Sequence, residues 1–442
     1  MNKEFFYKQI DALEKLHPDI NEMALARHMN SVFVNLQADP FQLRERKNNK
    51  KILSVEVGYG HDVIRPSLYK YFRGLGYEVD FLLCGNKPED RWNFFHRIKD
   101  YKARELIGNE AFIAAVLSLP VMEEYDYIFL NSNFVYNQNR FDSNLDYKKF
   151  MRALGLKDRC KHGFLTIPPH PAYYENTDTN LRHFTHLGTK HTPMLSVSYF
   201  GDVKITPKSD KNIFLVTGNI NHDQKNHDMV FEAVRQLLDE GVTNFELWIN
   251  GMLMNELVIP PALKEHIKYL GENKPETLFP ILEQADFIIA GLDSTQQWQR
   301  NSYAQGTCSV GLMYSMGFGK VYILEDMFAS AFGLNDQQAI IYSKGMLASA
   351  MKKAIALSTV DYASIQGQIL QEAARREERS FKDIEQTLKE LKRVYRKSVN
   401  SGFIWDLINK LNYLRLKICY FIFKNRREHY AEKLKKHTKI FL

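Results

Sequence analysis

The sequence is poor in cysteine and has no long apolar run. Its four cysteines lie far apart, and no two have the spacing of a metal-ligand pair: Cys84, Cys160, Cys308 and Cys419. We therefore expect neither a zinc site nor a disulfide framework, and this usage is typical of a reducing cytoplasm. No run of 18 apolar residues occurs, so no transmembrane helix is expected. The N-terminal residues carry acids throughout and lack an apolar core, which argues against a secretory signal.

Several catalytic motifs are absent as well. No Asp-x-Asp follows a predicted strand, and Asp178-Thr-Asn180 is the nearest approach to that metal-binding motif. A phosphate loop of the form Gly-x-x-x-x-Gly-Lys-Ser/Thr and a Gly-x-Ser-x-Gly elbow are also missing. His183, His186 and His191 lie near one another without a neighbouring acid or cysteine, so we expect no metal site.

The excess of positive charge is confined to the C-terminal tail. The chain has a net charge of +7, and residues 401–442 hold ten Lys and Arg against three Asp and Glu. The preceding 400 residues hold 49 charges of each sign, which is not the pattern of a protein with a broad basic surface. We therefore expect no nucleic-acid partner.

The same tail has an apolar stripe at helical spacing. Its members are Phe403, Ile404, Leu407, Ile408, Leu411, Leu414, Ile418 and Phe421. Lysines and arginines alternate with them, and Trp405 stands at the start. A basic amphipathic helix with aromatic residues is typical of segments that bind an anionic membrane surface. The alternatives are a helix packed on the rest of the chain and a contact between subunits.

Strands and helices alternate in two successive units. Hydrophobic patterns predict strands at 52–57, 77–83, 127–130, 163–167, 194–200, 212–217, 245–249, 267–271, 286–290 and 321–324. They predict helices at 4–38, 64–75, 226–240, 276–284 and 345–397, and a polar loop at 172–192. This alternation favours an α/β protein of two doubly wound, Rossmann-like domains that face each other across a cleft.

The domain boundaries follow from these patterns. We expect a helical N-terminal extension over residues 1–50, a first Rossmann-like domain over 51–205 and a second over 206–380. A helical basic tail over 381–442 completes the chain. The hinge between the two Rossmann-like domains is predicted near residues 200–210.

Four segments of the second half follow one another in an order that is typical of a known family. They read FLVTGNINHDQKNHDMVFEAVRQL, FELWING, IKYLGENKPETLFPILEQADFII and CSVGLMYSMGFGKVYIL. In this order they resemble the glycosyltransferases of GT-B fold, most closely those of family 4, and the resemblance covers roughly residues 194–325 and more weakly 52–83. It implies that the first domain binds an acceptor and the second a nucleotide sugar. The donor site is then centred on residues 214–227.

Lys225 is the main candidate in this donor site. When a nucleotide sugar reacts, negative charge grows on the departing diphosphate, and a fixed cation stabilises it. Lys225 stands in a loop directly before a predicted helix, whose N-terminus adds its dipole. The resemblance implies that this lysine contacts the diphosphate. An exposed surface lysine is the alternative.

Two strand-ending turns belong to the same expected donor site. One is Gly218-Asn219, where Asn219 replaces an arginine of the family pattern and the following loop is one residue longer. The other is Asn250-Gly251. The family pattern also has two glutamates that normally contact the sugar and the ribose, but the aligned positions here hold Gly306 and Tyr314.

Other residues of the second half are candidates to replace these missing groups. We expect Thr307, Ser309 and the backbone of Gly311 to bind ribose or phosphate. Glu325, just after a predicted strand, is the nearest acidic substitute. The alternative for Glu325 is a surface acid.

The first domain contributes two candidate positions. Gly58 and Gly60 follow the first strand and permit a close approach to a ligand. His61 comes next and is a candidate to bond a phosphate or acceptor, with a helix-capping or surface role as the alternative. His170 follows the predicted strand 163–167, and related enzymes often have a histidine near the transferred sugar at this place. A polar residue in a proline-fixed turn is the alternative for His170.

Together these features favour a bacterial glycosyltransferase at the inner face of the cell membrane. The resemblance implies a donor linked to UDP or GDP, no further cofactor, no metal and retention of anomeric configuration. It implies an acceptor that is a surface glycan or a lipid-linked sugar. The alternative is an inactive module of the same fold that binds glycan or stabilises a partner.

Overall fold

A computed structural model describes most of the chain. The described residues are 50–56, 62–84, 91–108, 125–131, 163–167, 181–189, 192–218, 225–252, 257–304 and 306–422. Beyond residue 393 the description is limited to the backbone. The chain divides into two compact units, Met1–Thr387 and Leu388–Leu442. The helix predicted at 4–38 lies outside the described residues.

The first sheet has six parallel strands in the order β3-β2-β1-β4-β5-β6. The strands are β1 (Lys50–Glu56), β2 (Tyr77–Cys84), β3 (Arg104–Gly108), β4 (Tyr127–Asn131), β5 (Gly163–Ile167) and β6 (Leu181–His183). The central strands are buried along most of their length, as expected for a parallel sheet covered on both faces. The short helix η1 (Asp62–Ile64) and α3 (Arg65–Gly74) follow β1.

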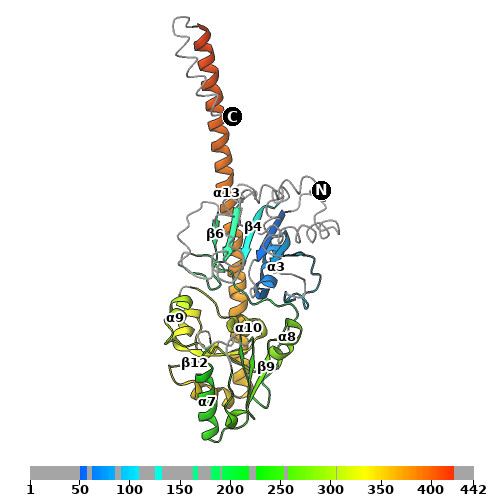
Figure 1. The fold of residues 1–442 in the computed structure, drawn as a ribbon, viewed down its shortest axis with the longest axis vertical. Helices are drawn as coiled ribbons and strands as arrows, with labels where there is room; N and C mark the ends of the chain where they lie inside the picture. The colour runs from blue at the N-terminus through cyan, green and yellow to red at the C-terminus, as the bar shows by residue number, and fades with distance from the viewer. Residues whose placement is uncertain are drawn as a thin grey trace, which may run out of the picture. The chain divides into compact units, whose positions relative to one another are not determined.

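The second sheet also has six parallel strands, in the order β12-β11-β10-β7-β8-β9. They are β7 (Ile213–Thr217), β8 (Glu246–Asn250), β9 (Ile267–Gly271), β10 (Phe287–Ile289), β11 (Val321–Glu325) and β12 (Ala339–Tyr342). Figure 1 shows the two sheets, with β4 and β6 labelled in the first and β9 and β12 in the second. Two parallel α/β sheets confirm the predicted fold class.

Helices cover both faces of the second sheet. They are α7 (His227–Asp239), η5 (Pro261–Leu263), α8 (Pro275–Gln284), α9 (Gln297–Ala304), α10 (Val310–Phe318), α11 (Asp326–Phe332) and α12 (Leu347–Ala356). Phe287 and Ile289 of β10 share one core with α7 and α12. Ile288 between them lies against Gly311 at the start of α10. Successive side chains of β10 therefore pack alternately against the helices on one face of the sheet and on the other.

The longest helix is α13 (Thr359–Ile422). Its first part is anchored to the second sheet, because Tyr362 Oη donates to the Asp286 carbonyl at 2.9 Å and Gln366 Nε2 to that of Gly319 at 2.8 Å. None of the described helices is long and apolar enough to cross a membrane.

The strand predicted at 194–200 is wrong. Leu195 and Val197 alternate with serines in the sequence, which produced the strand pattern, but Ser196 is buried as well. The backbone of this segment bonds to side chains of α13: Met194 N donates to Asp383 Oδ2 at 2.7 Å and Ser196 N to Ser380 Oγ at 2.9 Å. The segment is therefore an extended connection beneath a helix.

The sequence patterns also missed several elements. The polar stretch 172–192 contains strand β6 at its end, and the strands β3 and β12 and the helices α9 and α11 were not predicted. β3 and β6 are edge strands of the first sheet, and β12 is an edge strand of the second. Short edge strands need little apolar pattern, because one side has no neighbour.

Candidate functional site

Each sheet has one place where its strand order reverses direction. In the first sheet this place lies between β1 and β4, and in the second between β7 and β10. In open α/β sheets, ligands bind outside the carboxyl ends of the strands at such a switch point. The residues that follow Thr217 in β7 and Ile289 in β10 therefore form the first candidate site, which we call the donor edge.

Lys225 lies at this donor edge and is buried. Its side chain is 6% exposed, and its Nζ donates to the carbonyl oxygen of Ala290. The aliphatic stem passes between two glycines, since a Cβ at Gly291 would lie 3.3 Å from Lys225 Cδ and one at Gly218 would lie 3.8 Å from Cε. The interpretation of Lys225 as a surface lysine is therefore wrong.

Burial has an electrostatic consequence for Lys225. Desolvation lowers the pKa of its ammonium from 10.5 to about 8. Among the described residues no carboxylate forms an ion pair with it. A buried cation whose only described acceptor is one carbonyl is well placed to receive an anion.

Asn226 fixes the backbone directly after Lys225. It caps α7, with Oδ1 accepting from Met229 N at 2.9 Å, and its Nδ2 donates to Asp293 Oδ2 at 2.9 Å. Its backbone N–H donates to the Gly291 carbonyl at 2.9 Å. The start of α7 is thus tied to the loop after β10, and its dipole is held at the donor edge.

Gly218 and Gly251 bring the ends of the neighbouring strands β7 and β8 into close contact. Gly218 N donates to the Asn250 carbonyl at 3.1 Å, and Gly218 has a φ of 111° that favours glycine. Asn250 Oδ1 in turn accepts from Asn273 Nδ2 at 2.7 Å. The predicted turn residues Gly218, Asn250 and Gly251 therefore lie together at the donor edge.

The start of α10 lies on the other side of the donor edge. Ser309 caps the helix, and its Oγ accepts from Gly311 N at 3.3 Å. Gly311 is in close contact with the side chains of Tyr322 and Ile288. The backbone N–H of Thr307 donates to the Ser302 carbonyl at 3.3 Å. The Ser309 side chain and the Gly311 N–H are therefore paired with each other at the start of α10.

Glu325 ends β11 and is buried, with 4% exposure. Its carboxylate accepts from the hydroxyl of Ser294, and from Ser294 N at 3.4 Å. The interpretation of Glu325 as a surface acid is therefore wrong. Through Ser294 it fixes the loop after β10, to which Asp293 also belongs.

Comparison with known proteins gives the fold a name. No protein-family model matches the sequence, and no curated protein sequence matches it. A solved structure of an alpha-glucosyltransferase, in complex with UDP and a DNA 13-mer containing a HMU base, is similar with a TM-score of 0.50 and 10% identity. The match covers 78% of this chain and 99% of that one.

The chain has the GT-B fold. Two further solved structures are similar. A glycosyltransferase from Rickettsia africae has a TM-score of 0.48 and 13% identity, over 78% of this chain and 99% of that one. A pneumococcal O-GlcNAc transferase in complex with UDP and GlcNAc has a TM-score of 0.47 and 12% identity, over the same shares.

This GT-B chain has no acidic group at the two positions aligned with the family glutamates. Gly306 has a φ of 95°, and a Cβ there would lie 3.2 Å from the Thr185 side chain. Tyr314 is buried, and its ring centroid lies 5.5 Å from that of Phe200. A side chain at position 306 would press on Thr185, and a carboxylate at position 314 would be buried among aromatic rings.

Sequence reasoning missed polar residues that end apolar strands. Thr217 ends β7, and its hydroxyl is buried without a hydrogen-bond partner among the described residues. Asn131 ends β4 in the same way, and Glu56 ends β1 as a buried carboxyl group. The signal was available, since each is the polar final residue of an otherwise mostly apolar strand.

Several expected site residues lie outside the described residues: Gly58, Gly60, His61, His170 and Asn219. Within the described part of the chain, no cluster of three or more His, Cys, Asp or Glu side chains has an arrangement that holds a metal ion.

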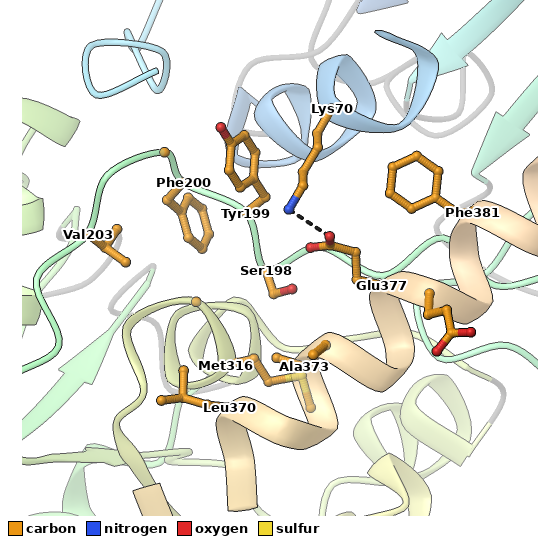
Figure 2. Close-up of a pocket in the computed structure, with 14 residues that line it drawn as sticks. Lys70, Ser198, Tyr199, Phe200, Val203, Met316, Leu370, Ala373, Glu377 and Phe381 are labelled. Atoms are coloured by element: carbon orange, nitrogen blue, oxygen red, sulfur yellow. Dashed lines mark ion pairs between the residues drawn. The ribbon is translucent and has the colours of Figure 1, made fainter. Parts of the chain in front are cut away.

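A pocket of about 550 Å³ lies at the predicted hinge (Figure 2). Tyr199 and Phe200 of the connecting segment line it, together with residues of α3, α10 and α13. Lys70 Nζ pairs with Glu377 Oε1 at 2.6 Å and lies 4.4 Å from the centroid of the Tyr199 ring. Because Lys70 belongs to α3 and Glu377 to α13, this ion pair joins the two helices across the pocket.

Proposed function

We propose that the protein is a glycosyltransferase that moves a sugar from a nucleotide-sugar donor to a hydroxyl group. The observation that supports it best is Lys225, a buried lysine at the switch point of the second sheet and directly before the start of α7. A cation, a helix N-terminus and glycine turns at one strand edge form a suitable site for a diphosphate.

The chemistry then follows from the positions of these groups. As the bond between the sugar and the diphosphate breaks, the electron pair moves to the phosphate oxygen. Lys225 stabilises the growing charge, and the first N–H groups of α7 add their dipole. The hydroxyl oxygen of the acceptor forms the new bond to the sugar, and its proton leaves on the departing diphosphate or on water.

The similar alpha-glucosyltransferase structure supports a nucleotide donor, since it contains UDP. We propose for this chain a UDP- or GDP-linked sugar, transfer without a metal ion and retention of configuration. We further propose a glycan or lipid-linked acceptor and a place at the inner face of a bacterial membrane. The basic, apolar pattern of residues 401–442 supports the membrane surface as a partner.

A second candidate is a GT-B module without catalytic activity that binds glycan or stabilises a partner protein. It is favoured by the two positions at which the family has glutamates, since both Gly306 and Tyr314 are packed against other residues. This candidate retains glycan binding but lacks turnover of any nucleotide sugar.

The two candidates are separated by a nucleotide-sugar panel. Binding of UDP, GDP and CMP is measured by calorimetry, and turnover of UDP-glucose, UDP-GlcNAc and GDP-mannose by nucleotide release. We expect one nucleotide to bind and its sugar to be turned over, and Lys225→Ala to lose both. Lys264→Ala, at an exposed lysine outside the donor edge, is the matched control. Absence of binding and turnover across the panel refutes the enzyme proposal.

A further inference from the structure

The pocket at the predicted hinge has a volume of about 550 Å³, and every residue that lines it belongs to the described part of the chain. We call it the hinge pocket. Its size lies in the range of roughly 300–1,000 Å³ that is typical of sites for small molecules. It is formed by residues 198–203 together with α3, the second half of α10 and α13. A molecule in this pocket therefore contacts helices from both α/β units at once.

The hinge pocket is separate from the donor edge, although one helix reaches both. The start of α10, at Ser309 and Gly311, lies at the donor edge, whereas Met316 and Gly317 line the hinge pocket. A helix rises about 1.5 Å per residue, so Gly317 lies about 9 Å further along the axis than Gly311. Among the described residues that line the pocket, none belongs to the donor edge. A ligand of the hinge pocket is therefore a second molecule, bound in addition to a nucleotide sugar.

The polar part of the hinge pocket is a balanced ion pair. Lys70 Nζ lies 2.6 Å from Glu377 Oε1, and the two side chains are 34% and 26% exposed. The ammonium also lies 4.4 Å from the centroid of the Tyr199 ring, which is a cation–π distance. The third charged residue of the lining, the exposed Glu378, pairs with Lys382 Nζ at 2.7 Å. The lining therefore has no unbalanced charge, and the pair offers a donor and an acceptor side by side.

Much of the remaining lining is apolar. Val203 and Leu370 are half-buried, and Met316 and Ala373 are buried. Figure 2 shows Val203 and Leu370 on one side of the pocket and the ion pair on the other. The flexible side chain of a methionine adapts to apolar ligands of different shape. The hinge pocket thus combines a polar end without net charge and an apolar end.

We propose that the hinge pocket binds an uncharged amphiphile of the monoacylglycerol type. Its hydroxyl-bearing head lies at Lys70 and Glu377, and its apolar chain lies against Val203 and Leu370. A hydroxyl group donates to a carboxylate and accepts from an ammonium, so it joins the ion pair without disturbing the balance of charge. An anionic head is repelled by Glu377 and a cationic head by Lys70. Such binding goes beyond the proposed sugar transfer and does not require it.

The test uses probes with one chain length and different heads. They are 1-octanoylglycerol, octanoate and octylammonium, with glycerol as the head without a chain, all below their micelle concentrations. Binding is measured by calorimetry and by saturation-transfer NMR. Ala374→Trp blocks the pocket, because Ala374 is an exposed residue of α13 in the lining and its new indole has room to enter. Ala363→Trp is the matched control, at an exposed alanine of α13 outside the lining.

We expect the wild type to bind 1-octanoylglycerol at least tenfold more tightly than the three other probes. Ala374→Trp is expected to lose this binding and Ala363→Trp to keep it. The melting temperature of the wild type rises with the concentration of the bound probe, since a ligand of the folded state stabilises it. Lys225→Ala binds the probe like the wild type, because the donor edge is a different site.

Two further variants test the choice of an uncharged head. Glu377→Gln leaves the Lys70 ammonium unbalanced and is expected to shift the preference to octanoate. Lys70→Met leaves the Glu377 carboxylate unbalanced and is expected to shift it to octylammonium. Both variants are expected to fold, since a partly exposed ion pair contributes little to stability. An ion pair with a structural role alone would not reverse the selectivity in this way.

Several outcomes overturn the proposal. They are a wild type that does not bind 1-octanoylglycerol, equal binding by wild type and Ala374→Trp, and a wild type that binds octanoate or octylammonium as tightly. Loss of binding in Lys225→Ala would place the amphiphile at the donor edge and overturn it too. Failure of the proposed transfer is distinguishable from all of these. If no nucleotide sugar is turned over but 1-octanoylglycerol binds and is lost in Ala374→Trp, the hinge site stands without the transferase.

Discussion

The carbonyl oxygen of Gly218 lies 1.7 Å from the point that a Cβ atom at Gly251 would occupy. The neighbouring ends of β7 and β8 therefore approach to a distance that only glycine permits. Because a Cβ at Gly218 would also lie 3.8 Å from Lys225 Cε, this close approach helps to set the position of the proposed diphosphate-binding group.

The first prediction concerns this close approach. Gly251→Ala forces the Gly218 turn to move and is expected to destabilise the protein by about 1–3 kcal/mol. Nucleotide affinity falls at least tenfold, because Lys225 moves with the turn. Calorimetric binding and thermal unfolding are the measurements. Gly367→Ala is the control, since a Cβ in that exposed position of α13 meets nothing within 4 Å and favours the helix. Equal nucleotide binding by Gly251→Ala and wild type would contradict the prediction.

The second prediction concerns the contribution of Lys225 to the free energy of unfolding as the pH changes. Its pKa is about 8 in the folded protein and near its ordinary 10.5 when unfolded. Between these values the unfolded chain binds more protons, so this group increases the free energy of unfolding as the pH rises from about 8 to about 10.5. The gain is on the order of 3 kcal/mol. Chemical denaturation across this range is compared for wild type and Lys225→Met. Lys320 also has a pKa lowered to about 8 and is kept in the variant, so only the difference between the two proteins reports on Lys225.

The third prediction follows from the same group. The protonated form of Lys225 binds a diphosphate, so the affinity for the nucleotide is expected to fall as the pH rises above about 8. Calorimetry with the selected nucleotide across pH 7 to 10 measures this. Lys225→Arg, whose side chain stays charged, is expected to bind with little pH dependence over this range. The same decline in both proteins would assign the titration to another group.

The fourth prediction concerns Asp286, which comes directly before β10. Its buried carboxylate accepts from Ser209 N, Ser209 Oγ and Ile213 N, at 2.7, 2.5 and 2.7 Å. Asp286→Ala leaves these donors unpaired and is expected to destabilise the protein by about 3–5 kcal/mol. Urea denaturation measures the loss, with Asp239→Ala at an exposed acid as the control. A loss no larger than that of the control would contradict the role of Asp286 as an anchor.

The fifth prediction concerns the tail. Removal of residues 401–442 takes away ten of the positive side chains and the apolar stripe. We expect the shortened protein to lose its binding to vesicles that contain phosphatidylserine, and the full chain to lose it in high salt. Sedimentation with vesicles measures both. Equal sedimentation of the two proteins would assign the tail to another partner.

The pattern of the sequence alone predicted the central strands of both sheets and singled out Lys225 as a candidate. Of the ten strands predicted from apolar runs, nine are present in the structure, because a parallel strand covered on both faces is a continuous apolar run. Lys225 was singled out because the segments around it, with a strand-ending glycine before it and a helix start after it, resemble the family pattern. Local features of this kind are fixed by residues that are neighbours in the chain.

Only the tertiary structure decided which groups the polar atoms of several other segments bond to. The segment 194–200 has the alternation of a strand, but the side chains of Asp383 and Ser380 accept from the N–H groups of Met194 and Ser196. Glu325 is a residue type usually found at the surface, but it is buried, and its carboxylate accepts a hydrogen bond from the hydroxyl of Ser294. The burial of Asn131 beside Glu56 depends on the order in which strands meet. Partners that lie tens of residues away in the chain leave no local signal, so only the folded arrangement shows them.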